Sequence, residues 1–237
     1  MFKEAKDIIF EKNIEFIMKI NTYIDHTLLK ADATLAQIQQ LCEEAKTYQF
    51  ASVCIPSYFV ADAYKILRQT NVKVCTVVGF PLGNSSTETK VREAQIAIEN
   101  GAEEIDMVIN QAAIKSNKWD DVQSDISQVK IVTGNYILKV ILETCNLTDE
   151  EIARACQEAD RAGADFVKTS TGFASGGATV EAVQIMKANI SANVKIKASG
   201  GIRDLETVQK YIDLGVSRIG ASSGVAIMEG TESNSSY

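Results

Sequence analysis

The chain has 237 residues, of which 46% are hydrophobic, and its formal net charge is -7. This length suits a single α/β barrel with a substantial core, so size alone does not require two domains. The acidic balance disfavours electrostatic attraction to nucleic acid or to an anionic membrane surface, although local positive groups could still bind an anionic small molecule.

Cysteine and histidine usage restricts the metal chemistry. The sequence has 5 cysteines without a C-x-x-C pair and 1 histidine, so no Cys/His zinc site can be written and we expect no metal. Thiols of this kind are typical of a cytoplasmic protein. No apolar run approaches the ~20 residues that span a bilayer, and the N-terminal segment shows no secretory signal.

Short β-rich segments alternate with longer amphipathic helical segments along the chain. We predict strands at 22–25, 51–55, 72–79, 104–110, 137–143, 165–168, 194–198 and 217–220. We predict helices near 34–48, 57–69, 86–99, 119–132, 148–162, 179–189, 204–214 and 222–229. Thr34 and Thr148 are candidate N-caps, and Gly101, Gly163 and Gly215 stand where helices should end.

The predicted fold class is α/β, because eight strand–helix units in strict alternation indicate a parallel sheet. Eight is also the number of strands that closes a (β/α)8 TIM barrel. An open doubly wound sheet is the alternative, but no G-x-G-x-x-G follows the first strand and no Walker loop is present. We expect residues 1–237 to form one barrel domain, with a helical extension over 1–20 and a flexible tail over 230–237.

Candidate chemistry lies at the carboxyl ends of the predicted strands, where barrel enzymes place their active sites. Side-chain alternation turns Asp106, Lys168 and Lys197 inward. Lys139 and Lys195 lie lower in their strands, where we expect them only to neutralise buried carboxylates. At the mouth, a second ammonium and partial desolvation would favour a neutral lysine that can attack a carbonyl, and Asp106 could relay protons.

Two glycine-containing loops predict a phosphate site. AlaSerGlyGlyIleArg at 198–203 follows the seventh strand, and GlyAlaSerSer at 220–223 follows the eighth and precedes the last helix. Free backbone N–H groups and a helix N-terminus at these loops favour an anion. The candidate contacts are Gly200, Gly201, Ser222 and Ser223.

These segments resemble the class I deoxyribose-phosphate aldolase family. The resemblance rests on LysThrSerThrGly at 168–172, GluIleAspMetVal at 104–108 and LysAlaSerGlyGlyIleArg at 197–203. AspHisThrLeuLeu at 25–29, ValCysIlePro at 53–56 and GlyPheProLeuGly at 79–83 also match, so the resemblance covers roughly residues 20–229.

The resemblance implies reversible cleavage of 2-deoxy-D-ribose 5-phosphate into D-glyceraldehyde 3-phosphate and acetaldehyde. Lys168 would form the Schiff base, Lys197 would favour its neutral form, and both would move protons with Asp106 and a water molecule. No cofactor would be needed, because the imine is the electron sink. Gly172 would join the phosphate site, and Asp25 and Thr27 would line the sugar end. Relatives often form homodimers.

Several positions leave alternatives open. Some family members carry a lysine where this chain has Phe173, so that phosphate contact is absent. Tyr237 could assist proton transfer, as a terminal tyrosine does in some members, although we favour a disordered tail. Cys54 could face the site, although we favour a core cysteine. His26 should turn away from the barrel interior.

Two other functions remain in competition. A transaldolase-like Schiff-base enzyme would keep the lysine and the phosphate loops but use another sugar phosphate, and activity with acetaldehyde as donor separates the two. A non-catalytic protein that binds phosphorylated metabolites would not require paired lysines. Borohydride trapping separates that function from the enzymes.

Overall fold

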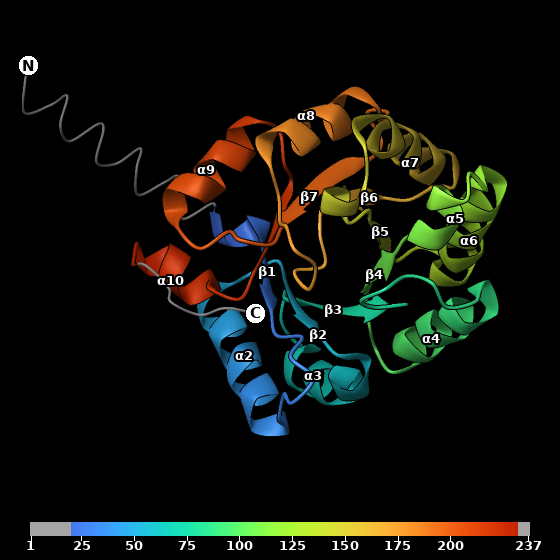
Figure 1. The fold of residues 1–237 in the computed structure, drawn as a ribbon. Coiled ribbons are helices and arrows are strands. Elements are labelled where there is room, and N and C mark those ends of the chain that lie inside the picture. The colour runs from blue at the N-terminus through green and yellow to red at the C-terminus, as the bar shows by residue number, and fades with distance from the viewer. Residues whose placement is uncertain (1–19, 232–237) are drawn as a thin grey trace, which may run out of the picture.

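A closed barrel of eight parallel strands forms the centre of the computed structural model, which describes residues 20–231 (Figure 1). Consecutive strands pair along the chain, and β8 closes the barrel on β1. The strands are β1 Ile24–Thr27, β2 Ser52–Ile55, β3 Lys73–Val78, β4 Glu104–Val108, β5 Ile137–Ile141, β6 Phe166–Lys168, β7 Lys195–Ser199 and β8 Arg218–Ala221. The predicted (β/α)8 barrel is therefore confirmed.

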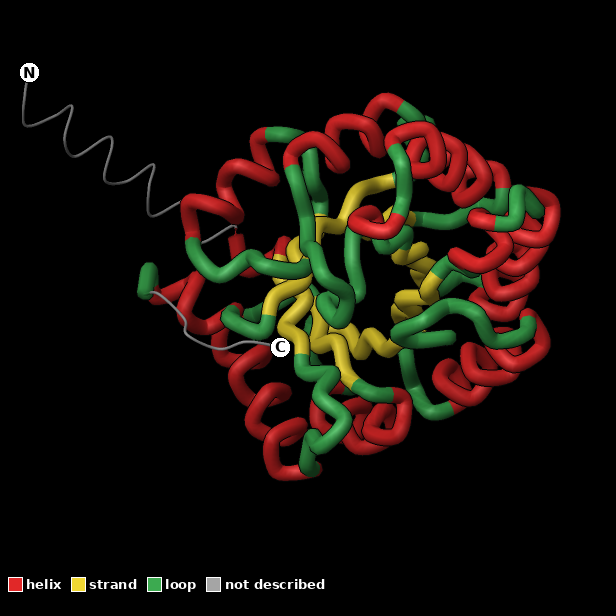
Figure 2. The backbone as a smooth tube through the Cα atoms, in the orientation of Figure 1, coloured by secondary structure: helices red, strands yellow, loops and turns green. Residues whose placement is uncertain are grey.

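Helices form a ring around the strands (Figure 2). The α-helices are α2 Leu35–Tyr48, α3 Val60–Leu67, α4 Thr87–Glu99, α5 Gln111–Lys115, α6 Trp119–Thr133, α7 Asp149–Arg161, α8 Val180–Ala188, α9 Leu205–Asp213 and α10 Gly224–Glu229. Short 3-10 helices occur at η1 Asn21–Tyr23, η2 Ser57–Phe59 and η3 Thr144–Asn146. No helix in residues 20–231 is long and apolar enough to cross a membrane.

The predicted capping signals are confirmed. Thr34 and Thr148 cap α2 and α7, each within a capping box that satisfies backbone N–H groups of the first turn. Gly101, Gly163 and Gly215 all follow helices with positive φ. The sequence pattern missed α5, because five residues are too few for a helical period to be read.

Most of the apolar core lies between the outer face of the barrel and the helices. Alternate strand residues such as Val53, Val74 and Ile105 point outward into this layer and are fully or almost fully buried. A small separate apolar cluster consists of Leu29, Cys54, Cys75 and Val77, with Phe80 packed against it. The rest of the barrel interior carries buried charge, so the outer layer supplies most of the hydrophobic stabilisation.

One boundary shift changes the position of a candidate residue. The first strand was predicted to end at Asp25, but residues 21–23 form η1 and β1 runs from Ile24 to Thr27. Asp25 therefore lies inside the barrel rather than at its mouth. The predicted helix over 1–20 and tail over 230–237 fall almost wholly outside the described residues.

Candidate active site

Lys168 and Lys197 converge on a single carboxylate oxygen. Lys168 Nζ lies 2.8 Å from Asp106 Oδ2, and Lys197 Nζ lies 2.7 Å from the same atom. The two lysines are register partners on the adjacent strands β6 and β7, which places their side chains side by side in the interior. The structure thus brings together the three residues that the sequence predicted as catalytic.

Beneath this group lies a second layer of charge. Lys139 Nζ lies 2.9 Å from Asp106 Oδ1 and 2.5 Å from Glu104 Oε2. Lys197 Nζ lies 2.5 Å from Asp25 Oδ2. Asp25 is fully buried and supports Lys197 from below.

Arg218 closes this network at the amino-terminal end of the barrel. It forms ion pairs with Asp25 and with Glu104, the latter at 2.7 Å from its Nη2. The sequence analysis missed Arg218, although its position two residues before Gly220 in β8 would have turned it inward by alternation. A buried carboxylate requires such partners, because an unpaired charge in the interior is costly.

The surroundings keep the supporting groups ionised. Burial alone would raise the pKa of Asp106, but the ammonium groups of Lys139, Lys168 and Lys197 hold that pKa well below its ordinary value. Burial would lower the pKa of Lys197, but the carboxylates of Asp106 and Asp25 raise it above its ordinary value. Lys197 therefore keeps its positive charge beside Lys168.

The ion-pair network inside the described barrel joins three carboxylates to four cations. The carboxylates are Asp25, Glu104 and Asp106, and the cations are Lys139, Lys168, Lys197 and Arg218. The carboxylates and the three lysines of this network are almost completely buried. Lys168 is the most exposed of these three lysines, at 3%. Lys195, by contrast, is exposed at the start of β7.

Buried polar contacts fix the segment after Lys168. Glu143, which follows β5, accepts hydrogen bonds from the backbone N–H and the hydroxyl of Thr171. Thr169 donates from its hydroxyl to the carbonyl of Ser199 at 3.0 Å, and Ser199 donates to the carbonyl of Ser170 at 2.6 Å. The β6 and β7 segments therefore hold each other rigidly at the carboxyl end of the barrel.

The predicted phosphate loops lie next to one another. Gly172, Gly200 and Gly201 have φ values of 86°, 85° and 80°, a region that favours glycine. A side chain on Gly201 would meet no atom within 4 Å, so its surroundings are open. Ser223 donates to the carbonyl of Ile202 at 3.2 Å and thereby joins the loops after β7 and β8. Ser222 instead borders a cavity with Thr27.

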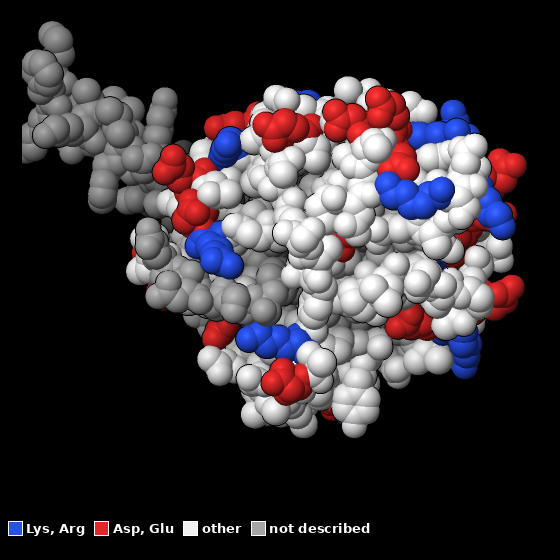
Figure 3. All heavy atoms as spheres, in the orientation of Figure 1, with Lys and Arg blue, Asp and Glu red and all other residues white. Residues whose placement is uncertain are grey.

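Aromatic side chains meet near the mouth. The rings of Phe80, after β3, and Phe173, after β6, pack edge to face with centroids 5.1 Å apart. In the face shown in Figure 3, charged side chains lie mainly around the periphery and other residues form most of the centre. Phe173 is 45% exposed.

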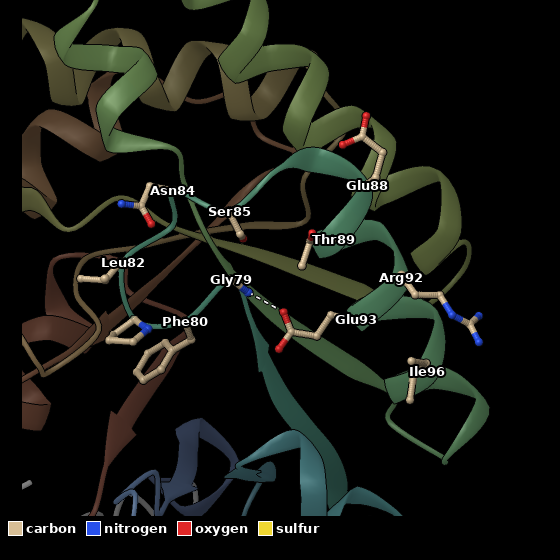
Figure 4. A pocket seen from close by; sticks show the side chains of 11 residues that line it. Gly79, Phe80, Leu82, Asn84, Ser85, Glu88, Thr89, Arg92, Glu93 and Ile96 are labelled. Carbon is tan, nitrogen blue, oxygen red and sulfur yellow. Dashed lines mark hydrogen bonds between the residues drawn. The ribbon is translucent and has the colours of Figure 1, made fainter.

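A cavity of about 750 Å³ lies beside the β3–α4 loop (Figure 4). Glu93 on α4 accepts a hydrogen bond from the backbone N–H of Gly79 at 2.8 Å and fastens this loop. None of the three converging residues Asp106, Lys168 and Lys197 lines the cavity. The large volume of this cavity is therefore no evidence that the reaction takes place there.

Cys54 and Cys75 meet in the barrel interior. They are register partners on β2 and β3, and Cys75 Sγ lies 3.2 Å from Asp106 Oδ1. Cys54 is buried in an apolar cluster, as preferred, but that cluster lies inside the barrel next to Asp106. The contact between the two thiols could not be predicted, because they are far apart in sequence. With Asp106 they offer three possible metal ligands within 4.8 Å, but the nearby ammonium groups oppose a dication.

Two other candidate residues, His26 and Thr27, make hydrogen bonds in or beside β1. His26 turns away from the interior, as predicted, and its Nε2 lies 2.7 Å from Glu44 Oε2 on α2. Thr27 ends β1 and donates from its hydroxyl to the carbonyl of Asp25 at 2.8 Å. Tyr237 lies outside the described residues.

Comparisons with known proteins agree with this geometry. A family model described as DeoC/LacD family aldolase matches residues 19–230. A Lactococcus lactis subsp. cremoris (strain SK11) protein named deoxyribose-phosphate aldolase is 56% identical over 220 residues, which cover 93% of this chain and 100% of the relative. A Geobacillus sp. (strain WCH70) protein of the same name is 56% identical over 215 residues, which cover 90% of this chain and 96% of the relative.

Solved structures are similar as well. A deoxyribose phosphate aldolase from Aeropyrum pernix, described as having a unique tetrameric structure, has a TM-score of 0.83 and 32% identity, and the match covers 90% of this chain and 91% of that chain. A protein described as QR15, an aldolase, has a TM-score of 0.85 and 43% identity, and the match covers 89% of this chain and 94% of that chain.

Proposed function

Because the chain belongs to the DeoC/LacD family of aldolases, we infer that it is a deoxyribose-phosphate aldolase, a class I lyase. Its reaction is the reversible cleavage of 2-deoxy-D-ribose 5-phosphate into D-glyceraldehyde 3-phosphate and acetaldehyde. The observation that supports a Schiff-base site most strongly is the convergence of Lys168 and Lys197 on Asp106 Oδ2.

Lys168 is the residue proposed to form the imine. Its neutral amine attacks the aldehyde carbon of the open-chain sugar, and loss of water gives the protonated imine. The bond between the second and third carbons then breaks, and its electron pair moves into the imine to give an enamine. Protonation of the enamine and hydrolysis release acetaldehyde and restore the amine.

Lys197 and Asp106 are proposed to serve this sequence in different ways. Lys197 remains charged because of its two carboxylate partners, and its charge opposes protonation of Lys168. Asp106 contacts both lysines, so with a water molecule it can move the proton of the third-carbon hydroxyl as that bond breaks. Lys139 and Arg218 hold the carboxylates in place from below.

The phosphate group is proposed to bind at the loops after β6, β7 and β8. Gly172, Gly200 and Gly201 allow close backbone approach, and the open space beside Gly201 can accommodate an anion. Ser222 and Ser223 complete the proposed site. Phe173 supplies no positive charge there.

We further propose that the chain is a single-domain cytoplasmic protein that forms a homodimer and needs no cofactor. Its substrates are small phosphorylated sugars and aldehydes, and it has no nucleic-acid or membrane partner. Light scattering on the purified protein tests the dimer, since a monomer or a tetramer would contradict it.

A cleavage assay tests the proposed function. Purified protein is mixed with deoxyribose 5-phosphate, and both acetaldehyde and glyceraldehyde 3-phosphate are quantified with coupled dehydrogenases. Equal amounts of the two products, with no cleavage by Lys168→Ala, are expected. A different pair of products would identify another sugar-phosphate aldolase.

A further inference from the structure

Cys54 and Cys75 form a dithiol pair inside the proposed active site. Neighbouring parallel strands lie about 4.8 Å apart, which is within the range of Cα separations that disulfides span. The two residues are direct register partners, and their side chains point to the same interior side with Val77 and Phe80. Their sulfur atoms lie within 4.8 Å of one another. A disulfide could therefore form with only a local adjustment of the side chains.

The other three cysteines differ from this pair. Cys42 and Cys156 are buried in the layer between barrel and helices, and Cys145 is exposed after β5. None of the five forms a disulfide within the described residues. Only the dithiol pair adjoins charged groups of the proposed reaction site, since Cys75 Sγ lies 3.2 Å from Asp106 Oδ1 and 3.4 Å from Lys139 Nζ.

We propose that Cys54 and Cys75 are a site of reversible oxidation by peroxides, at which disulfide formation inactivates the enzyme. The sulfur of Cys54 attacks one oxygen of hydrogen peroxide, the O–O bond breaks, and a sulfenic acid and one water form. The sulfur of Cys75 then attacks the sulfenic sulfur, the S–O bond breaks, and a second water leaves. The two thiols lose two hydrogen atoms in total, and one peroxide molecule is reduced to two water molecules.

The two thiols differ in a way that suits these roles. The hydrogen bond with Cys75 lowers the pKa of Cys54, and the ammonium groups of Lys197 and Lys168 also lower it. Burial raises the pKa of Cys75 well above its ordinary value. Cys54 is therefore the more nucleophilic sulfur toward peroxide, and Cys75 is the partner that resolves the sulfenic acid.

Disulfide formation would disturb the catalytic carboxylate directly. It removes the S–H group that donates to Asp106 Oδ1, and it changes the sulfur that Lys139 contacts. Loss of one hydrogen bond to a charged group corresponds to a roughly ten-fold or greater effect. We therefore expect the oxidised enzyme to turn over at least about ten-fold more slowly, with recovery after reduction.

Peroxide titration of the Cys145→Ser protein tests the proposal, because this background excludes cross-links through the exposed thiol. Intact mass spectrometry should show the loss of two hydrogen atoms. Tryptic digestion without reductant should yield one disulfide-linked species that joins residues 47–65 with residues 74–90. Activity should fall in step with this species and return with dithiothreitol, and deoxyribose 5-phosphate should slow its formation.

Variants and independent readouts separate the possible results. In Cys145→Ser/Cys75→Ala, Cys54 has no resolving partner, so peroxide should add oxygen and dithiothreitol should not reverse higher oxidation. The proposal is overturned if no linked species forms, if it links other cysteines, or if the linked protein keeps full activity. The mass readout does not depend on the aldolase reaction, so failure of the proposed function would be recognised separately.

Discussion

Lys168 and Lys197 donate to the same oxygen of Asp106, at 2.8 and 2.7 Å. Two ammonium groups on one carboxylate oxygen repel each other, and the interior below already pairs its remaining carboxylates with Lys139 and Arg218. Lys197 also pairs with Asp25, whereas the carboxylate with which Lys168 pairs is Asp106. This relationship supports the assignment of Lys168 as nucleophile and Lys197 as permanent cation.

Lys197→Leu should leave the barrel folded but lower kcat at pH 7 by at least about 100-fold, because the charge that opposes protonation of Lys168 is lost. Lys195→Leu is the matched control on the same strand, since Lys195 is exposed at its start. Circular dichroism checks the fold. Unchanged kcat at pH 7 for Lys197→Leu would contradict the assignment.

The three residues at the centre of the site could be predicted from the sequence, because the alternation of side chains along a strand and the ends of strands are local sequence signals. They turned Asp106, Lys168 and Lys197 inward, and the barrel brought them together. The position of Asp25 could not be predicted, because three residues of 3-10 helix before β1 shifted its depth. The Cys54–Cys75 contact depends on the register between two strands, which no local pattern specifies.

Asp25→Asn should make the free energy of unfolding depend less on pH in the acidic range. Burial would raise the pKa of Asp25, but Arg218 and Lys197 lower it below its ordinary value. Its contribution is therefore present above the unfolded-state pKa and lost as pH falls below about 4. Between pH 4 and pH 2.5, the slope of unfolding free energy against pH should fall by up to ~1.4 kcal/mol per pH unit.

Urea unfolding of both proteins across that range measures the slope. Exposed Asp120→Asn provides the control, because Asp120 has no place in the interior network. An Asp25→Asn slope identical to that of the parent protein would show that this carboxylate is not held ionised by its partners.

Ser223→Glu should impair the phosphorylated substrate selectively. The new carboxylate would repel the phosphate, whereas free deoxyribose carries no charge at that position. We expect kcat/KM for deoxyribose 5-phosphate to fall at least about 100-fold and that for deoxyribose to fall much less, so the unphosphorylated sugar controls for damage at buried Ser223. Equal losses for the two sugars would place the phosphate elsewhere.

Phe173→Lys should lower KM for deoxyribose 5-phosphate severalfold, because it places an ammonium next to the proposed phosphate loops. Phe173→Leu is the control, since it also removes the ring contact with Phe80 but adds no charge. Steady-state kinetics with both sugars separates the two effects. If Lys and Leu change KM equally, the charge has no access to the phosphate.

Chelators should leave the activity unchanged, because the imine itself stabilises the electron pair released by bond cleavage. The ammonium groups of Lys139 and Lys168 also occupy the positions around Asp106 where a cation would bind. Assays after dialysis against EDTA measure this. Activity that disappears and returns with a divalent metal would indicate a metal-dependent aldolase.

Borohydride trapping tests the central claim most directly. The protein is reduced in the presence of acetaldehyde, digested and mapped by mass spectrometry, with Lys168→Ala as the matched variant. We predict one ethyl group, located on Lys168, and none in the variant. An ethyl group on Lys197 in place of Lys168, or no modification of either lysine, would contradict the account.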